Sequence, residues 1–178
     1  MSRISTPSVD AATGATAELF GQIKKAVGTV PNAYAAIGSL NPGALQSVLG
    51  IDAVLAAGNL SKQDQEIIKL LVSSVAGCDY CVAAHSLLGK ISGIDQGTLK
   101  NIRHGQATHD AKRDALIHFV RTLINSQGTL ARADYDTIIA AGYTSAQLVD
   151  ISLAIAAITF TNVFNRINDT VIDFPAVD

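Results

Sequence analysis

Several features that mark specialised classes of protein are missing from this sequence. Neither sign of charge is in excess, because the net charge is −2 and the isoelectric point is about 6.0. Such a chain has no strong field to attract nucleic acid or an anionic membrane surface. Runs of alternating valine, threonine and aromatic residues, which are typical of strands, are also absent, and aromatic residues make up only 5% of the chain. We therefore expect neither a polyanion-binding protein nor a β-rich fold.

Long apolar runs are absent as well. The longest uncharged apolar stretch covers residues 151–165 and contains Asn162 and Asn165, so it falls short of the ~20 apolar residues that span a bilayer. We expect it to form a buried helix. Met1 is followed by a stretch rich in serine, threonine and arginine and not by the apolar core of a secretory signal. The sequence thus predicts a cytoplasmic protein with no membrane association.

Cysteine is scarce, and the two that occur are close together. Cys78 and Cys81 are the only cysteines of the chain, separated by two residues. A disulfide across so short a loop restrains the unfolded chain very little. In a reducing compartment a disulfide is usually transient and catalytic. The pair therefore indicates redox chemistry and not a structural cross-link.

The chain does contain helix-forming segments, which are separated by glycine and proline residues typical of helix ends. No linker rich in proline, serine or glycine divides it, so we predict one domain over residues 1–178 with an all-α fold. The predicted helices are 15–27, 31–39, 42–57, 62–76, 78–91, 96–104, 111–126, 131–141 and 145 to about 170.

A weak internal repeat lies within this helical sequence. Gly58, Ser61, Gln63 and Glu66 recur 84 positions later as Gly142, Ser145, Gln147 and Asp150. Each set places a turn and a capping residue before a long apolar helix. We interpret the pattern as two weakly related helical units, of which only the first contains thiols.

The most informative segment is Gly77–His85, which contains both cysteines and ends on a histidine. On a helix, positions 78, 81 and 85 fall within an arc of roughly 60°. Two sulfurs and an imidazole therefore share a face, where the thiols can form a short disulfide and His85 can take or return a proton. Tyr80 falls on the opposite side, where we expect it to pack.

Glu66 is the upstream acid that we expect to face inward toward this motif. In one straight helix it would lie about 18 Å from Cys78, so a turn at Gly77 must fold the chain back before Glu66 can orient His85. The same turn leaves the first backbone amides after Gly77 free to stabilise a thiolate. The negative charge of Asp79 disfavours the thiolate. Asn162, Asn165 and Arg166 are candidates for lining a pocket or an oligomer interface.

Two other interpretations of the motif remain open. Both cysteines can be small buried residues without chemistry, since free cysteine is among the most buried residue types. Alternatively, Cys78, Cys81 and His85 can supply three zinc ligands with Glu66 as a fourth, although structural zinc usually draws on two separated pairs.

The segment from Glu66 to Gly93 resembles the AhpD-like alkylhydroperoxidase branch of the carboxymuconolactone decarboxylase superfamily. The resemblance rests on the glutamate, the Cys-Asp-Tyr-Cys motif and the following Ala-Ala-His. The later stretch 158–166 is similar to the closing helix of that family. One difference lies at Tyr80, where the well-characterised branch has a second histidine of the proton relay.

The resemblance implies an all-helical AhpD-like domain, with the thiol motif in residues 60–105, that forms homo-oligomers often built on trimers. It implies reduction of organic hydroperoxides, with Cys81 as the attacking thiolate, Cys78 as the resolving thiol, and His85 with Glu66 as the proton relay. The expected partners are a hydroperoxide substrate and a dithiol reductant of thioredoxin or lipoyl type, and no metal or other cofactor is expected. The alternatives are a carboxymuconolactone decarboxylase-like enzyme and a non-enzymatic redox-responsive oligomeric module.

Overall fold

The computed structural model describes residues 1–177, and all regular structure within them is helical. One short 3₁₀ helix (Val9–Ala11) precedes nine α-helices, and no strand occurs in the described part of the chain. The helices are α1 (Gly14–Val27), α2 (Asn32–Leu40), α3 (Pro42–Ala57), α4 (Lys62–Ala76), α5 (Asp79–Ile91), α6 (Gln96–His104), α7 (Ala111–Asn125), α8 (Arg132–Ala140) and α9 (Ser145–Asn168). The all-α prediction is confirmed, and each predicted helix end lies within two residues of the observed one.

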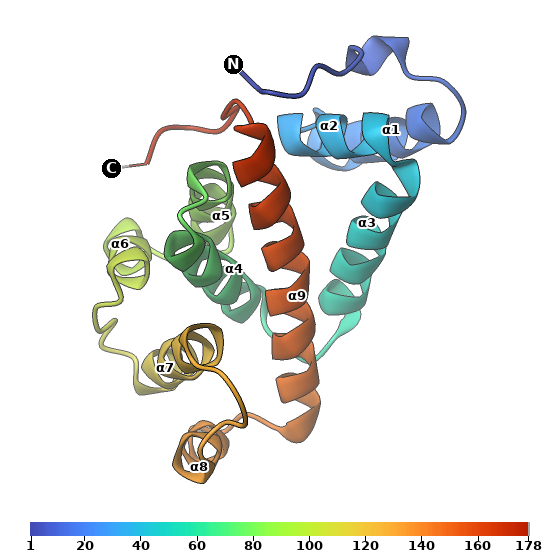
Figure 1. Cartoon of the computed structure of the whole chain (residues 1–178). Coiled ribbons are helices and arrows are strands. Elements are labelled where there is room, and N and C mark those ends of the chain that lie inside the picture. The colour runs from blue at the N-terminus through green and yellow to red at the C-terminus, as the bar shows by residue number, and fades with distance from the viewer. Residues whose placement is uncertain (178) are drawn as a thin grey trace.

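Helix α9 runs through the middle of the molecule and separates two groups of helices (Figure 1). On one side α4 packs against α5, α6, α7 and α9, and on the other α1 and α2 pack on α3, which in turn contacts α9. The two groups have separate apolar clusters, because Phe20, Ile37 and Leu45 form a small core of α1–α3 apart from the main one. Helix α4 is therefore the central element, and it positions Glu66.

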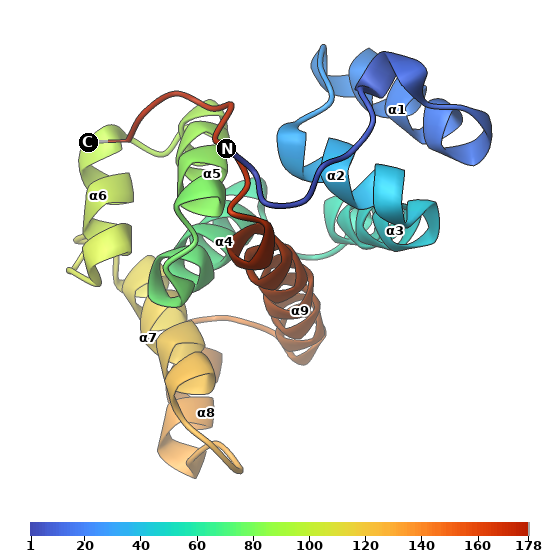
Figure 2. The ribbon, with the colours of Figure 1, turned by 45° about the horizontal axis from the view of Figure 1, so that its top comes forward.

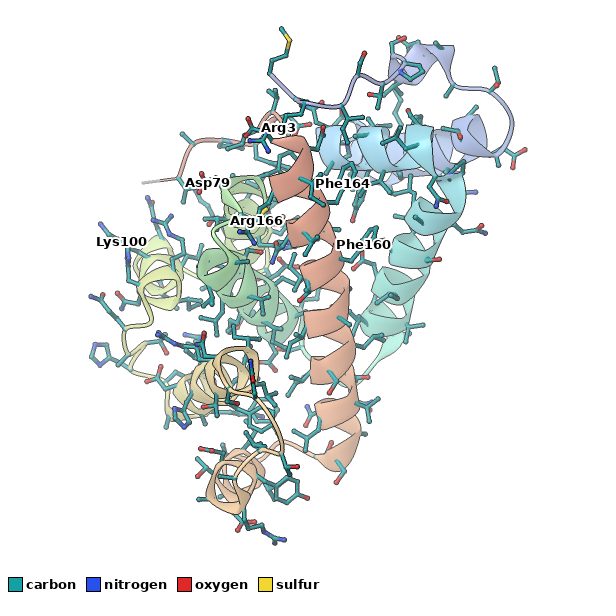
Figure 3. All side chains as sticks on the ribbon, viewed as in Figure 1. Arg3, Asp79, Lys100, Phe160, Phe164 and Arg166 are labelled. Atoms are coloured by element: carbon teal, nitrogen blue, oxygen red, sulfur yellow. The ribbon has the colours of Figure 1, made fainter. Side chains whose placement is uncertain are left out.

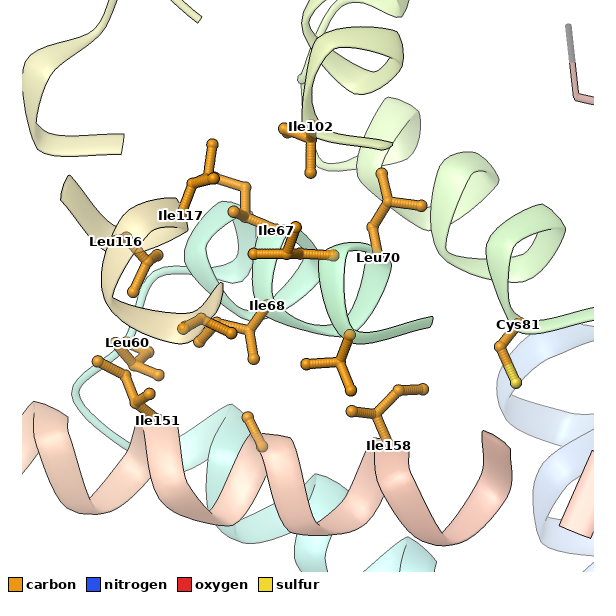
Figure 4. Close-up of a cluster of buried hydrophobic side chains, with 14 of the residues drawn as sticks. Leu60, Ile67, Ile68, Leu70, Cys81, Ile102, Leu116, Ile117, Ile151 and Ile158 are labelled. Atoms are coloured by element: carbon orange, nitrogen blue, oxygen red, sulfur yellow. The ribbon is translucent and has the colours of Figure 1, made fainter. Parts of the chain in front are cut away.

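The main core surrounds α4 (Figure 4). Ile67, Ile68, Leu70 and Leu71 follow one another along this helix, and each is at most 1% exposed. A helix that is apolar on several sides must be covered on several sides, as the packing of four neighbouring helices shows. Burying each such side chain contributes about 1.5–3 kcal/mol. Cys81 lies at the edge of this cluster in Figure 4.

Helix α9 buries only one of its faces. Ile151, Ala154 and Ile158 are buried, whereas Phe160 and Val163 are exposed. The predicted buried helix is thus correct for the inner face and wrong for the outer one, because α3 and α4 do not enclose it. By length and composition α9 could also cross a membrane, but the core helix of a soluble protein passes the same test.

The two terminal segments meet over the end of α9 (Figure 2). The backbone N–H of Arg3 donates to the carbonyl of Asn168 at 2.7 Å, and the N–H of Ile4 donates to Asn168 Oδ1 at 2.9 Å. The N–H of Val171 donates to Ser2 Oγ at 3.1 Å. These bonds hold the terminal segments beside the start of α5.

The turn before α4 hydrogen-bonds to the first two turns of α9, so the two units of the internal repeat are in contact. Asp150 Oδ2 accepts from the backbone N–H of Asn59 at 2.7 Å, and Gln147 Nε2 donates to the carbonyl of Asn59 at 3.0 Å. The likeness between the units ends at Gly77, because α4 stops there while α9 continues without a break.

Candidate functional site

Gly77 makes the turn that folds the thiol motif back onto α4. Its φ and ψ are 66° and 39°, the left-handed conformation that glycine adopts without the cost borne by other residues. Its N–H donates to the carbonyl of Ser74, and the N–H of Cys78 donates to that of Ser73. Helix α5 therefore starts directly after the turn and packs along α4.

The two cysteines lie side by side at the beginning of α5. Their Sγ atoms are 2.8 Å apart, both thiols are free, and the residues are only 2% and 3% exposed. Cys78 is the N-cap residue and no side chain caps the helix, so the first-turn amides remain close to its sulfur. The predicted approach of Cys78 and Cys81 is confirmed.

Glu66 and His85 form the second pair of the site. His85 Nδ1 lies 2.8 Å from Glu66 Oε2, and the side chains are 13% and 14% exposed. The turn at Gly77 thus brings Glu66 back to His85, as predicted. A proton on Nδ1 donated to the carboxylate leaves Nε2 with its lone pair, and no described residue hydrogen-bonds to that atom. His85 is one turn after Cys81, so the helix joins both pairs.

Two asparagines of α9 complete the buried side of the site. Asn165 Nδ2 donates to Cys81 Sγ at 3.3 Å, and Asn162 Oδ1 accepts from Ser73 Oγ at 3.0 Å. Asn162 Nδ2 and Asn165 Oδ1 are buried and have no partner among the described residues. In the repeat alignment these asparagines correspond to Cys78 and Cys81, and that was the only sequence signal linking them to the thiols.

The two sulfurs have opposite pKa shifts. Its hydrogen bond with Cys81 lowers the pKa of Cys78, and Arg166 lowers it further, while burial and Asp79 act against them. The same hydrogen bond and burial raise the pKa of Cys81, and hydrogen bonds from Asn165 and Thr161 oppose the rise. The hydrogen bond between the sulfurs therefore favours the thiolate on Cys78 over the thiolate on Cys81.

A further polar group borders the site from two other helices. Lys69 Nζ lies 2.8 Å from Asp52 Oδ1, and the hydroxyl of Tyr34 donates to Asp52 Oδ2 at 3.3 Å. Burial raises the pKa of Tyr34, and the negative charges of Asp52 and Glu66 raise it further, so the phenol stays protonated. Sequence analysis missed this group because its members come from α2, α3 and α4 without a shared motif.

Tyr80 packs, as predicted. Its hydroxyl accepts from the backbone N–H of Ala33 at 3.1 Å, and its ring meets the edge of Phe174 with centroids 5.4 Å apart. It therefore joins α5 to α2 and to the C-terminal segment.

The zinc interpretation finds no ligand cluster in residues 1–177. Within that range no three histidine, cysteine, aspartate or glutamate side chains are arranged to hold a metal ion. Cys78 with Cys81, and Glu66 with His85, are instead two separate hydrogen-bonded pairs.

Comparisons with known proteins agree with this architecture. Residues 42–121 match the model of the carboxymuconolactone decarboxylase family. None of the curated proteins matches the sequence. An uncharacterized peroxidase-related protein with an alkylhydroperoxidase AhpD core, from Ralstonia eutropha JMP134, superposes with a TM-score of 0.86 at 19% identity, covering 97% of this chain and 92% of the other.

Two further solved structures are similar over nearly the whole chain. A peroxidase-related protein from Silicibacter sp. TM1040 has a TM-score of 0.83 and 23% identity, covering 96% of this chain and 91% of the other. The debrominase Bmp8, in a cysteine-to-alanine variant bound to 2,3,4-tribromopyrrole, has a TM-score of 0.79 and 20% identity. The match covers 97% of this chain and 94% of the other. These structures share the fold of nearly the whole chain, and residues 42–121 match the carboxymuconolactone decarboxylase family model.

Proposed function

We propose that this protein is a thiol-dependent peroxidase that reduces organic hydroperoxides with Cys78 and Cys81. One observation carries the proposal: the two sulfurs lie 2.8 Å apart, and one turn later His85 is held 2.8 Å from Glu66. A nucleophilic sulfur, a resolving thiol within reach and an imidazole oriented by a carboxylate are the groups that two-electron cleavage of an O–O bond requires.

The first half-reaction oxidises the cysteine pair. The Cys81 thiolate attacks the distal oxygen of the hydroperoxide, so that an S–O bond forms, the O–O bond breaks and an alkoxide leaves. His85, which has first taken up a proton on Nε2, donates that proton to the alkoxide, which gives an alcohol and a sulfenic acid on Cys81. The sulfur of Cys78 then attacks that of Cys81, hydroxide departs, and the Cys78 proton converts it to water. The second half-reaction, by a dithiol of thioredoxin or lipoyl type, restores both thiols.

The surroundings of Cys81 support its part as the attacking sulfur. A thiolate on Cys78 becomes a thiolate on Cys81 when one proton crosses the 2.8 Å between the sulfurs. Asn165 Nδ2 then donates to the Cys81 thiolate, and His85 lies one turn away on the same helix. Glu66 stabilises the imidazolium form of His85 that serves as the acid.

Rapid-mixing kinetics with cumene hydroperoxide and dihydrolipoamide test the proposal. We expect Cys81→Ser to lower kcat/KM by roughly 10³-fold or more, as removal of a nucleophile does in other enzymes. In Cys78→Ser, Cys81 should still form a sulfenic acid that dimedone traps, but no disulfide should close. A stoichiometric dose of peroxide should remove two thiols from the parent, and the reductant should restore them. Equal rates for Cys81→Ser and the parent would refute the proposal.

The same variants separate the remaining candidates. An activity that survives replacement of both cysteines would indicate a carboxymuconolactone decarboxylase-like enzyme. Oxidation that changes assembly without turnover would indicate a redox-responsive module. A thiol pair can also supply the two electrons that replace a bromine substituent by hydrogen and release bromide. The assay therefore includes 2,3,4-tribromopyrrole, the ligand of the Bmp8 structure, as a second substrate.

We also propose that the chain forms a homo-oligomer through the outer face of α9. Val149, Phe160, Val163 and Ile167 are exposed on this helix, and the stretch between Ile151 and Asn165 has no charged residue. A second copy of the chain is the occupant expected for an uncharged face of this length. Sedimentation should give an assembly at micromolar concentration, and Phe160→Lys should shift it toward the monomer. A monomeric parent protein would refute this.

A further inference from the structure

A pocket of about 570 Å³ opens at the junction of α5, α9 and the terminal segments. Cys78 and Asn165 lie on its wall, and Cys81 does not. The charged groups around it are Arg166, Asp79 and Asp169. Figure 3 shows Arg166 and Asp79 near the neighbouring ends of α9 and α5. The pocket thus borders Cys78 and not Cys81, at the side where α5 begins.

Asn165 is the second observation that points to a ligand here. The residue is only 3% exposed, and its Oδ1 has no hydrogen-bond partner among the described residues. Leaving a buried acceptor unpaired costs about 1–3 kcal/mol. The other atom of the same amide, Nδ2, is bonded to Cys81 Sγ. One side chain therefore contacts the pocket and the hidden sulfur at once.

We propose that this pocket admits the reductant, a small dithiol, and that the reductant attacks Cys78. The inference rests on the proposed function, since it assigns the second half-reaction to a site. The pocket wall also contains Met1, Tyr80, Val171 and Ile172, which provide apolar contact for the carbon chain of a dithiol. The carboxylates of Asp79 and Asp169 are balanced by the Arg166 guanidinium and the Met1 α-amino group, and such a lining favours a reductant of low charge over a polyanionic thiol.

The exchange balances with Cys81 as the leaving group. A thiolate of the reductant attacks Cys78 Sγ, a new S–S bond forms between them, and the Cys78–Cys81 bond breaks with its electron pair on Cys81. Asn165 Nδ2 donates to that thiolate, and a good leaving thiolate speeds exchange. The second thiol of the reductant then attacks the mixed disulfide and releases Cys78. The dithiol leaves as a cyclic disulfide, and two protons remain on the cysteine pair.

The approach at Cys78 also agrees with the charges around it. Arg166 makes no ion pair with any described residue, and its charge lowers the pKa of Cys78. The same charge attracts an incoming thiolate to the pocket and stabilises Cys78 when it is released. Glu66 and His85 do not line this pocket, so the peroxide and the reductant meet the pair on different sides of α5.

A single-turnover experiment tests the site without any peroxide. The disulfide is formed with diamide, dithiothreitol is added, and samples are quenched with N-ethylmaleimide for mass spectrometry. Ile172→Trp fills the pocket mouth, and Leu88→Trp, at a residue of similar exposure away from the pocket, is the matched control. We expect Ile172→Trp to slow reduction at least tenfold more than it slows oxidation by hydroperoxide, and Leu88→Trp to change that ratio less than twofold.

Single-cysteine proteins give a second measurement. Cys78 in Cys81→Ser should react with a bulky maleimide at least ten times faster than Cys81 does in Cys78→Ser. Equal or faster reaction at Cys81, or equal slowing of reduction and oxidation by Ile172→Trp, would overturn the inference. If the diamide-formed disulfide is reduced through the pocket but no hydroperoxide is consumed, the proposed function fails while the reductant site stands.

Discussion

The interface between α4 and α9 has an apolar end and a polar end. At the apolar end Ile68 and Leu71 of α4 meet Ile151 and Ile158 of α9 within one continuous cluster. At the polar end Ser73 of α4 meets Asn162, and next to it Asn165 meets Cys81 of α5. Both ends are buried, but only the second leaves polar atoms without partners.

This difference shows that one end of the interface stabilises the fold and the other end holds the groups of the thiol site. Close packing of aliphatic side chains at the apolar end stabilises the fold through the hydrophobic effect. This hydrophobic stabilisation offsets the free-energy cost of two unpaired amide atoms and two buried thiols at the polar end. Functional sites commonly carry such locally unfavourable groups, and the rest of the structure holds them in place.

The largest effect is expected from Ile68→Ala, which creates a cavity at the apolar end. Ile68 is fully buried, so the free energy of unfolding should fall by about 2–5 kcal/mol in urea denaturation. Thiol reactivity of the folded protein should not change, because Ile68 lies at the apolar end of the interface and the thiols lie at the polar end. Ile91→Ala, at an exposed position outside α9, is the control. A large change in Cys78 reactivity in folded Ile68→Ala would show that the two ends are not independent.

In the pair of Glu66 and His85, Glu66→Gln should lower peroxide turnover by roughly 10²-fold, the lower range for general acid–base catalysis. The amide can still accept from His85 Nδ1 but no longer stabilises the imidazolium. The molecule provides a matched control in Asp134→Asn, since Asp134 Oδ1 lies 3.2 Å from His118 Nε2 on the surface. Both variants should unfold at similar denaturant concentrations. An equal loss of turnover in both would exclude a specific role for Glu66.

A smaller effect, of opposite sign, is expected from Asn162→Leu. The substitution removes the unpaired Nδ2, while Ser73 Oγ keeps its 2.7 Å bond to the carbonyl of Lys69. The free energy of unfolding should therefore stay the same or rise by up to about 1 kcal/mol. Asn165→Leu should instead change thiol chemistry, because it removes the donor to Cys81. A loss of more than 1 kcal/mol in Asn162→Leu would mean that a bound water or ligand pairs this amide.

The smallest effect concerns the pH dependence of Cys78. Because its pKa is lowered in the folded protein, the thiolate forms at lower pH than in a peptide, where the midpoint lies near 8.5. The midpoint of iodoacetamide alkylation should accordingly lie below that value. Cys81→Ala removes the main cause and should raise the midpoint, and Arg166→Gln should raise it by less. A midpoint that falls in either variant would contradict this assignment of charge.

Local patterns were sufficient to predict the helices and the thiol motif. Glycines and prolines mark the helix ends, and a spacing of three and four residues places Cys78, Cys81 and His85 together in any helix. The contact of Glu66 with His85 followed from one local assumption, a turn at Gly77. The outer face of α9 was missed because an apolar run does not tell which of its sides will be covered. Tyr34 and Asp52 were missed because no local rule brings α2, α3 and α4 together.

The sequence by itself determined the all-α class, the helix boundaries and the redox-capable pair, because these depend on backbone propensity and on spacing within a helix. Tertiary structure decided which sulfur faces the pocket, which asparagine contacts Cys81, and where polar atoms stay unpaired. Those properties depend on how α4, α5, α9 and the terminal segments pack, and packing joins residues far apart in the chain.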